Sequence, residues 1–192
     1  FIFGSIVGTG LPPAPTYIIT ALVIAPFFTK AGFDPWVVHF FAFFVAVWGE
    51  LTPPTSVTAA VAAKIADASF TWTMLRAIGV CIPLFVLMGG VFARPELVRE
   101  PGVAQLLAGG LVLAGTVGIT FSLHGRYSTR LPLDGLMRGA VGAFSLLALF
   151  HPSTQVAAGA LVPVLLLIGY GFYQSQRLWR EAPSAPLLAR GS

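Results

Sequence analysis

Long apolar runs separated by short polar stretches divide the 192-residue chain into six hydrophobic blocks. The blocks cover residues 1–28, 36–65, 73–93, 103–123, 136–150 and 156–173. Most of them approach or exceed the roughly 20 apolar residues with which a helix crosses a bilayer, whereas the fifth is marginal. None sustains the alternation of apolar and polar residues that is typical of a membrane β-barrel. The pattern predicts an all-α polytopic membrane protein.

The first block contains two short apolar arms, "FIFGSIV" and "YIITALVIAPFF", joined by "GTGLPPAPT", residues 8–16. Each arm is too short to span a bilayer alone, so we expect a re-entrant helical hairpin whose tip is this joining segment. Glycines in the tip permit unusual dihedrals and close approach of a ligand, and prolines oppose a continuous helix. The tip glycines are Gly8 and Gly10, the prolines are Pro12, Pro13 and Pro15, and the hydroxyls are Thr9 and Thr16.

The second block is interrupted at its middle by "TPPT", residues 52–55. Pro53 and Pro54 donate no N–H, and Thr52 precedes a proline, so we expect a broken transmembrane helix. We expect the backbone from Glu50 to Thr55 to be non-helical and to face the hairpin tip. Backbone breaks at membrane depth occur where they line a polar cavity, and their free carbonyls and helix ends bind ions. The two interrupted blocks therefore predict a transporter binding site, with about four further transmembrane helices behind it.

Composition supports the membrane assignment and argues against other classes of protein. Hydrophobic residues make up 56% of the chain and charged residues only 9%, whereas a soluble domain carries about 25% charged residues. The net charge of +4 does not indicate nucleic-acid binding, because the basic residues are scattered between apolar runs. The sequence contains no phosphate-binding loop, metal-ligand cluster or nucleophile–base signature, so neither an enzyme nor a cofactor is expected.

These motifs carry a resemblance to a known family. The segment from "GTGLPPAPT" through "GELTPPTSVTAAVAAKIA" resembles the C-terminal part of the large, M-type permease subunit of TRAP transporters, the tripartite ATP-independent periplasmic carriers. The pairing of a G-x-G-L-P tip with a downstream T-P-P, and the following "FTWTMLRAIGVCIPLFVLMGGVFARPEL", resemble its TAXI branch in particular. The resemblance covers residues 1–97, which it implies to be the second-repeat transport region. Residues 98–192 would be extra C-terminal spans and a tail.

The resemblance implies a secondary transporter of the bacterial or archaeal cytoplasmic (inner) membrane that works by an elevator mechanism. It implies uptake of a small organic acid, delivered by a periplasmic substrate-binding protein and driven by a gradient of Na⁺ or H⁺. A small membrane subunit, or a fused N-terminal region, would be a further partner. Because the chain opens without Met, we expect a preceding part that holds an inverted counterpart hairpin. The implied substrate and ion residues are Gly8, Thr9, Gly10, Pro12, Thr52, Pro53, Pro54 and Thr55, with Na⁺ at Thr9, Thr52 and Thr55.

Glu50 departs from the family pattern, in which this position is usually small or apolar. A carboxylate at membrane depth is costly and is a functional hypothesis by default. Glu50 is therefore a candidate coupling residue, as a proton carrier or an ion ligand, and the choice between Na⁺ and H⁺ stays open. The structural alternative is a pairing with a basic group. His39 lies three helical turns earlier, so direct pairing with it is not expected.

The basic residues predict the orientation. If each later block crosses once, eight of the eleven Lys and Arg residues fall on one side, including those of the C-terminal tail. The positive-inside rule then places the tail in the cytoplasm and both ends of the 1–28 hairpin outside. Two other functional classes remain open: a channel or assembly subunit whose breaks are structural, and an intramembrane enzyme using Glu50. The latter would need a second catalytic group at membrane depth, and none is visible.

Overall fold

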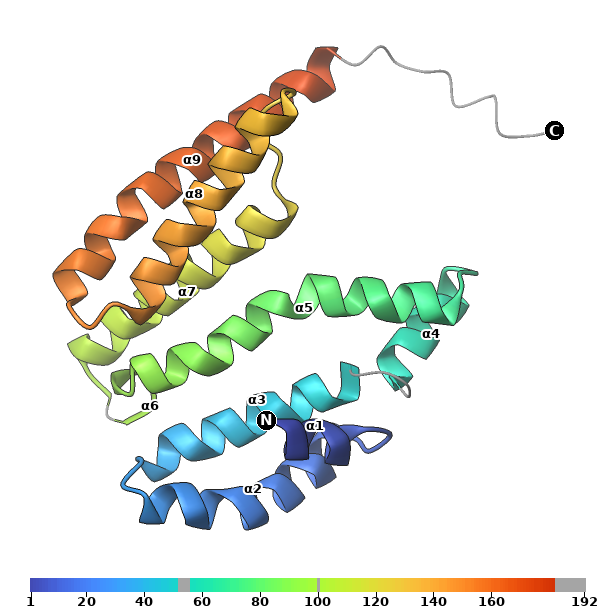
Figure 1. Cartoon of the computed structure of the whole chain (residues 1–192), viewed down its shortest axis with the longest axis vertical. Helices are drawn as coiled ribbons and strands as arrows, with labels where there is room; N and C mark the ends of the chain where they lie inside the picture. The colour runs from blue at the N-terminus through green and yellow to red at the C-terminus, as the bar shows by residue number, and fades with distance from the viewer. Residues whose placement is uncertain (52–55, 100, 182–192) are drawn as a thin grey trace.

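The computed structural model describes residues 1–51, 56–99 and 101–181, which form helices and no strands (Figure 1). This confirms the predicted all-α class. The helices are α1 (Ile2–Gly8), α2 (Pro13–Lys30), α3 (Pro35–Leu51), α4 (Val57–Ile65), α5 (Phe70–Ala93), α6 (Glu96–Arg99), α7 (Val103–His124), α8 (Leu131–Phe150) and α9 (Thr154–Glu181).

Four of the described helices are long and apolar enough to cross a membrane: α5, α7, α8 and the first 21 residues of α9. Helix α3 is apolar but shorter, at 17 residues. These helices support the predicted polytopic membrane protein. Helix α8 begins at Leu131, five residues before the predicted block, because Pro132 suits the first turn of a helix. With 20 residues, α8 is therefore a full-length span and not a marginal one.

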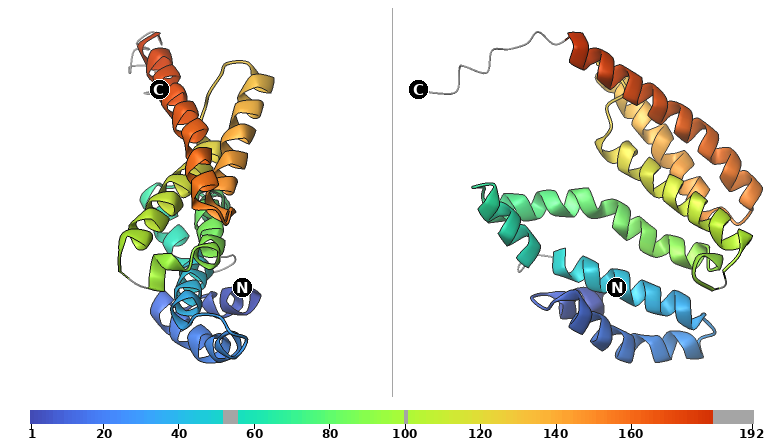
Figure 2. Two further views of the ribbon diagram at one scale, coloured as in Figure 1. Left: turned by 90° about the vertical axis from the view of Figure 1, so that its left-hand side faces the viewer. Right: turned by 180° about the vertical axis from the view of Figure 1, so that it is seen from behind.

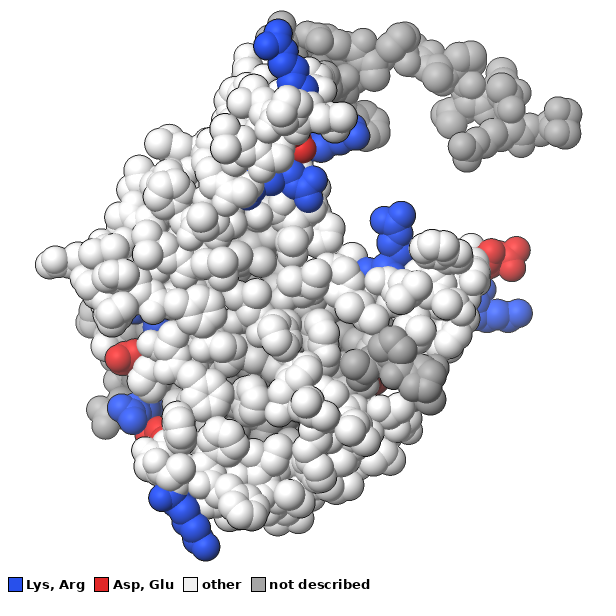
Figure 3. All heavy atoms as spheres, in the orientation of Figure 1, with Lys and Arg blue, Asp and Glu red and all other residues white. Residues whose placement is uncertain are grey.

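Successive long helices run in opposite directions through the bundle (Figures 1 and 2). The α4–α5 turn and the α7–α8 loop lie toward the right of Figure 1, and the α2–α3, α5–α7 and α8–α9 connections lie toward its left. Charged side chains gather at these two ends and leave the middle of the visible face largely uncharged (Figure 3). An uncharged belt between charged ends fits a protein that sits across a bilayer.

Helices α1, α2 and α3 pack together at one side of the bundle, with α1 in contact with both others. Helix α2 begins at Pro13, four residues before the predicted second arm. The helix is interrupted between α1 and α2, as expected, but Pro13 and Pro15 belong to α2 and not to the turn, so only residues 9–12 of the predicted tip are non-helical. Both prolines sit in the first turn, where the missing N–H would have no intrahelical acceptor.

Helices α3 and α4 together lie along α5. The ring of Trp48 near the end of α3 lies 5.8 Å from the ring of Phe85, and Trp48 packs with Val45 and Met88 in a buried cluster. Helix α5 is about 36 Å long by its residue count, and Phe85 lies about 12 Å from its C-terminal end. Because α3 runs antiparallel to α5 and continues for three residues past Trp48, it ends beside the middle of this full-length span.

Candidate functional site

The crossing of α1 and α3 brings two backbones into direct contact. A Cβ atom built on Gly8 would lie 2.7 Å from the Cα of Gly49, and one built on Gly49 would lie 2.8 Å from the Cα of Gly8. One turn earlier, a Cβ on Gly4 would lie 2.3 Å from Cγ1 of Val45. Small residues four apart on α1 thus meet residues four apart on α3, a pattern that permits close helix packing in lipid. This contact therefore holds the end of α1 against Gly49, the residue directly before Glu50.

Two threonines of α2 complete the packing around α1. The methyl group of Thr16 lies 3.3 Å from the Cβ position of Gly8, and that of Thr20 lies 3.3 Å from the Cβ position of Gly4. Both threonines are fully buried. The hydroxyl of Thr16 donates to the carbonyl of Pro12 at 3.0 Å, whereas the buried hydroxyls of Thr20 and Ser5 find no hydrogen-bond partner in the described part of the chain.

The α1–α2 turn, residues 9–12, contains four of the predicted site positions or borders them. Thr9 ends α1 in an extended conformation, and its hydroxyl donates to the carbonyl of Ser5 at 3.0 Å. Gly10 has a φ of 82°, a left-handed conformation that favours glycine. Gly10 and Pro12 are exposed within the described chain, whereas Thr9 is half-buried. Because a hydroxyl that donates one hydrogen bond keeps its oxygen lone pairs, Thr9 retains the capacity to ligate a cation.

A hydrogen bond crosses the junction between α3 and α4, by which we mean the described residues on either side of 52–55. The hydroxyl of Thr58 donates to Oε1 of Glu50 at 2.8 Å. Ser56 begins α4 as its N-cap: its buried Oγ accepts the N–H of Ala59 at 3.1 Å. Glu50 and Leu51 belong to the last turn of α3, so the expectation of a non-helical backbone at Glu50 is wrong.

Only some of the predicted site residues lie in the part of the chain that the structure describes. Gly8, Thr9, Gly10 and Pro12 lie at the end of α1 and in the α1–α2 turn, and Gly8 is in contact with the α3 end that carries Glu50. Thr52, Pro53, Pro54 and Thr55 lie outside the described residues. The Na⁺ ligation predicted for Thr9, Thr52 and Thr55 stays a prediction.

Three residues at the site were missed from the sequence. Thr58 was missed because its partner Glu50 lies eight positions away, and the sequence pattern does not show how close the two become. Ser56 carried an available signal, since a serine directly before an Ala-rich helical segment is a typical N-cap. Gly49 was noted only beside the interruption and not as a packing position, although the four-residue spacing of Gly4 and Gly8 indicated a helix crossing that needs a small partner.

His39 finds its partner on α2 and not in the junction. Its Nδ1 lies 2.9 Å from the hydroxyl of Tyr17. This geometry agrees with the expectation that His39 does not pair with Glu50, and it ties the first half of α2 to the first half of α3.

Comparison with known proteins gives one finding for this chain. A family model described as "Tripartite ATP-independent periplasmic transporter, DctM component" matches residues 1–97, which include α1 to α5 and the hairpin and junction described above. Neither curated proteins nor solved structures give a match.

Proposed function

Because this chain belongs to the DctM component family of tripartite ATP-independent periplasmic transporters, a family of permeases, we propose that α1 to α4 build half of its site for substrate and coupling ion. The observation that carries the proposal is the contact between Gly8 and Gly49. It holds the α1–α2 turn against the end of α3, beside the middle of the span α5. A helix end and a turn at this depth need polar contacts, which a bound ion and an organic acid would supply.

The proposed ligands are oxygen atoms. Thr9 supplies a hydroxyl at the turn, and Thr52 and Thr55 are included on the sequence argument alone. Oxygens of this kind suit a small hard cation such as Na⁺. Glu50 is the proposed coupling residue. Its carboxylate is half-buried and accepts a hydrogen bond from Thr58 across the junction, and both features support a role in which the charge of Glu50 changes during transport.

The proposed mechanism is an elevator movement that carries this site across the membrane. The proposed partners are a periplasmic substrate-binding protein, which would deliver a small organic acid, and a small membrane subunit or fused region. The charge distribution supports a cytoplasmic C-terminal tail in the inner membrane, because the α4–α5 turn and the α7–α8 loop lie at the more basic end of the bundle. The TAXI branch is proposed from the G-x-G-L-P tip and the T-P-P motif.

Uptake of labelled organic acids by the complete transporter in membrane vesicles tests the proposal. We expect saturable uptake that requires both the substrate-binding protein and an imposed gradient of Na⁺ or H⁺. Flux that is unsaturable and independent of any gradient would instead support a channel. Intact membrane assembly without any flux would support a structural subunit.

A further inference from the structure

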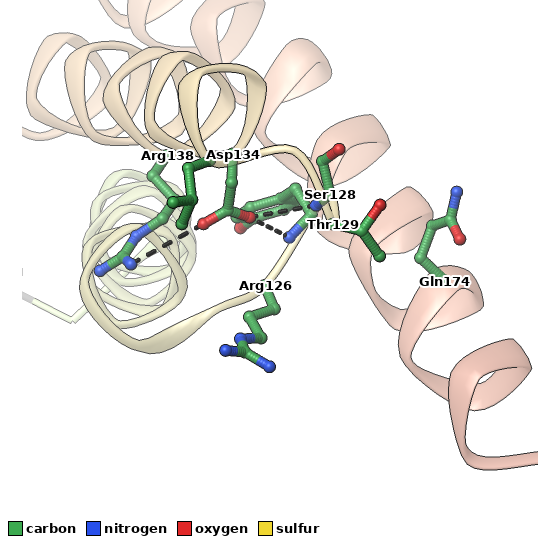
Figure 4. A pocket seen from close by; sticks show the side chains of 8 residues that line it. Arg126, Ser128, Thr129, Asp134, Arg138 and Gln174 are labelled. Carbon is green, nitrogen blue, oxygen red and sulfur yellow. Dashed lines mark hydrogen bonds and ion pairs between the residues drawn. The ribbon is translucent and has the colours of Figure 1, made fainter. Parts of the chain in front are cut away.

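A polar pocket of about 390 Å³ lies at the end of the bundle that carries the α7–α8 loop, outside the segment that the family model matches. Its walls come from the loop, from the first turns of α8 and from α9 (Figure 4). The polar side chains that the argument below uses are those of Arg126, Thr129, Asp134, Arg138 and Gln174. The pocket opens where the spans α7, α8 and α9 end, which is the level of lipid headgroups.

The loop that forms the pocket is held rigidly. Tyr127 is 1% exposed, and its ring fills a slot against Gly171 of α9, where an added Cβ would lie 2.8 Å from two ring carbons. Its hydroxyl donates to the carbonyl of Phe121 at 3.3 Å, and burial raises the pKa of this phenol, so it stays a neutral donor. Such anchoring presents the neighbouring side chains in a fixed geometry before any ligand binds.

The one carboxylate in the pocket is already engaged. Oδ1 of Asp134 accepts the backbone N–H groups of Tyr127 at 2.7 Å and Ser128 at 3.1 Å, and Oδ2 lies 3.9 Å from Nη1 of Arg138. Arg138 in turn donates to the carbonyls of Ser122 and Leu123 at the end of α7. Asp134 and Arg138 therefore stabilise the loop and each other.

Arg126 is different, because it makes no hydrogen bond or ion pair with any residue that the structure describes. It is exposed at the rim of the pocket, and Thr129 and Gln174 line the same space from the loop and from α9 (Figure 4). Gln174 uses one amide N–H on the hydroxyl of Tyr170 and keeps the other. The pocket thus offers neutral donors and a guanidinium that Asp134 attracts without a direct ion pair, and with two arginines and one aspartate it carries net positive charge.

A second hollow of about 320 Å³ adjoins this pocket and shares Arg126 and Tyr127 with it. Its other walls include Phe121 and Phe172, and Phe172 is 57% exposed on the outer face of α9. A polar pocket and a more apolar hollow that share one arginine match the polar headgroup and the apolar tail of a phospholipid. We propose that the α7–α8 loop and α9 form a phosphate-binding site that takes the headgroup of an anionic phospholipid.

The test uses the full chain purified in a neutral detergent, with lipid binding measured by native mass spectrometry. Phosphatidylglycerol and phosphatidylcholine with identical acyl chains are the probes. The variant is Arg126→Gln, and the matched control is Arg130→Gln, which removes the same charge from an exposed position of the same loop that does not line the pocket. We expect phosphatidylglycerol to bind more tightly, Arg126→Gln to weaken it about fivefold, and Arg130→Gln to change it little.

Competition with inorganic phosphate, at constant ionic strength against chloride, distinguishes the source of the phosphate group. Absence of competition supports the lipid headgroup, and displacement of lipid by phosphate that depends on Arg126 supports a soluble phosphate at the same site. Equal weakening by both arginine variants would mean diffuse attraction to basic residues and would overturn the proposal. Equal affinity for the two lipids would also overturn it.

Discussion

The carboxylate of Glu50, in the last turn of α3, accepts a hydrogen bond of 2.8 Å from the hydroxyl of Thr58, in the first turn of α4. This bond joins the two helices across residues 52–55. If Glu50 takes part in transport as proposed, a change in its charge would act on both helix ends through this bond.

Two substitutions separate the charge of Glu50 from its hydrogen bond. Glu50→Gln keeps a carbonyl that can accept from Thr58 and removes the charge. If Glu50 carries the coupling proton, this variant should lose pH-driven uptake and keep substrate exchange. Thr58→Val removes the donor and keeps the charge, with an expected loss of about 1–2 kcal/mol in the free energy of unfolding, and Thr58→Ser is the control that restores the hydroxyl. Normal pH-driven uptake in Glu50→Gln would exclude a proton-carrying role.

Alanine at Gly8 or Gly49 should destabilise the protein. Each new methyl group would overlap the backbone of the opposite helix, and a backbone cannot move aside as a flexible side chain can. We expect a loss of about 1–3 kcal/mol in the free energy of unfolding, typical of overpacking. Gly79→Ala in α5 is the matched control, because no atom outside its own helix lies within 4 Å of the new Cβ. Denaturant unfolding in detergent measures the stability of all three variants. Equal losses at the three positions would contradict the close crossing.

Valine at the proposed Na⁺ ligands Thr9, Thr52 and Thr55 keeps the shape of the side chain and removes an oxygen. We expect uptake to need a higher Na⁺ concentration for half-saturation, with little change in protein abundance. Thr73→Val is the control, because the hydroxyl of Thr73, like that of Thr9, donates at 3.0 Å to the carbonyl four residues earlier. Sodium dependence that none of the three variants alters would place the coupling ion elsewhere.

Arg94 connects the family-matched region to the helices that follow. It is 5% exposed, and its Nη2 donates to the carbonyls of Ala148 at 3.2 Å and His151 at 3.0 Å, at the end of α8. A cation there is favourable because a helix C-terminus carries partial negative charge. Arg94→Met should cost about 1.5–3 kcal/mol of unfolding free energy. Arg99→Met, which breaks an exposed ion pair with Asp34, should cost at most about 1 kcal/mol.

Asp34, which precedes α3, gives stability a dependence on acid pH. Burial raises the pKa of this carboxyl, but hydrogen bonds from the N–H groups of Trp36 and Val37 and from Arg99 outweigh it, so the pKa lies below its ordinary value of 3.8. A lowered folded-state pKa stabilises above the unfolded value, and this contribution is lost as the pH falls through the folded one. In Arg99→Met the folded-state pKa lies closer to the unfolded value, so this contribution should be smaller and its loss should be complete at a higher pH, as thermal unfolding across the acid range would reveal. Asp34→Asn is the control without the titrating group, and an unchanged acid profile in Arg99→Met would argue against the ion pair.

The long spans could be predicted because their apolar length is itself the physical requirement for crossing a bilayer. The helix start at Pro13 was placed too late, because proline was taken as a helix breaker where it occupied the first turn. The start at Leu131 was placed too late, because the apolar block began only after Asp134 and Gly135, although Pro132 suits a first turn. Local signals of this kind are readable once the position of the proline in the helix is considered.

Contacts between helices were harder to predict. The sequence contains Gly4 and Gly8, but only the register of α1 on α3 shows that Gly49 is their partner. Likewise the Glu50–Thr58 bond depends on how the chain returns after residues 52–55. Arg94 gave no local sign of reaching α8, since its acceptors are backbone carbonyls, which every residue possesses. Local pattern therefore predicted the elements, and the three-dimensional register decided which residues meet.

The contact of Gly8 with Gly49 restricts how the protein can change shape. Where side chains separate two helices, changes of rotamer let one slide over the other in small steps. Here no side-chain layer exists at the crossing, so α1 cannot shift along α3 unless the two backbones first separate. In the proposed elevator movement, the hairpin and α3 would consequently travel as one rigid unit. Any opening that admits or releases a ligand would then have to come from the short turn between α1 and α2, with the helices themselves keeping their spacing.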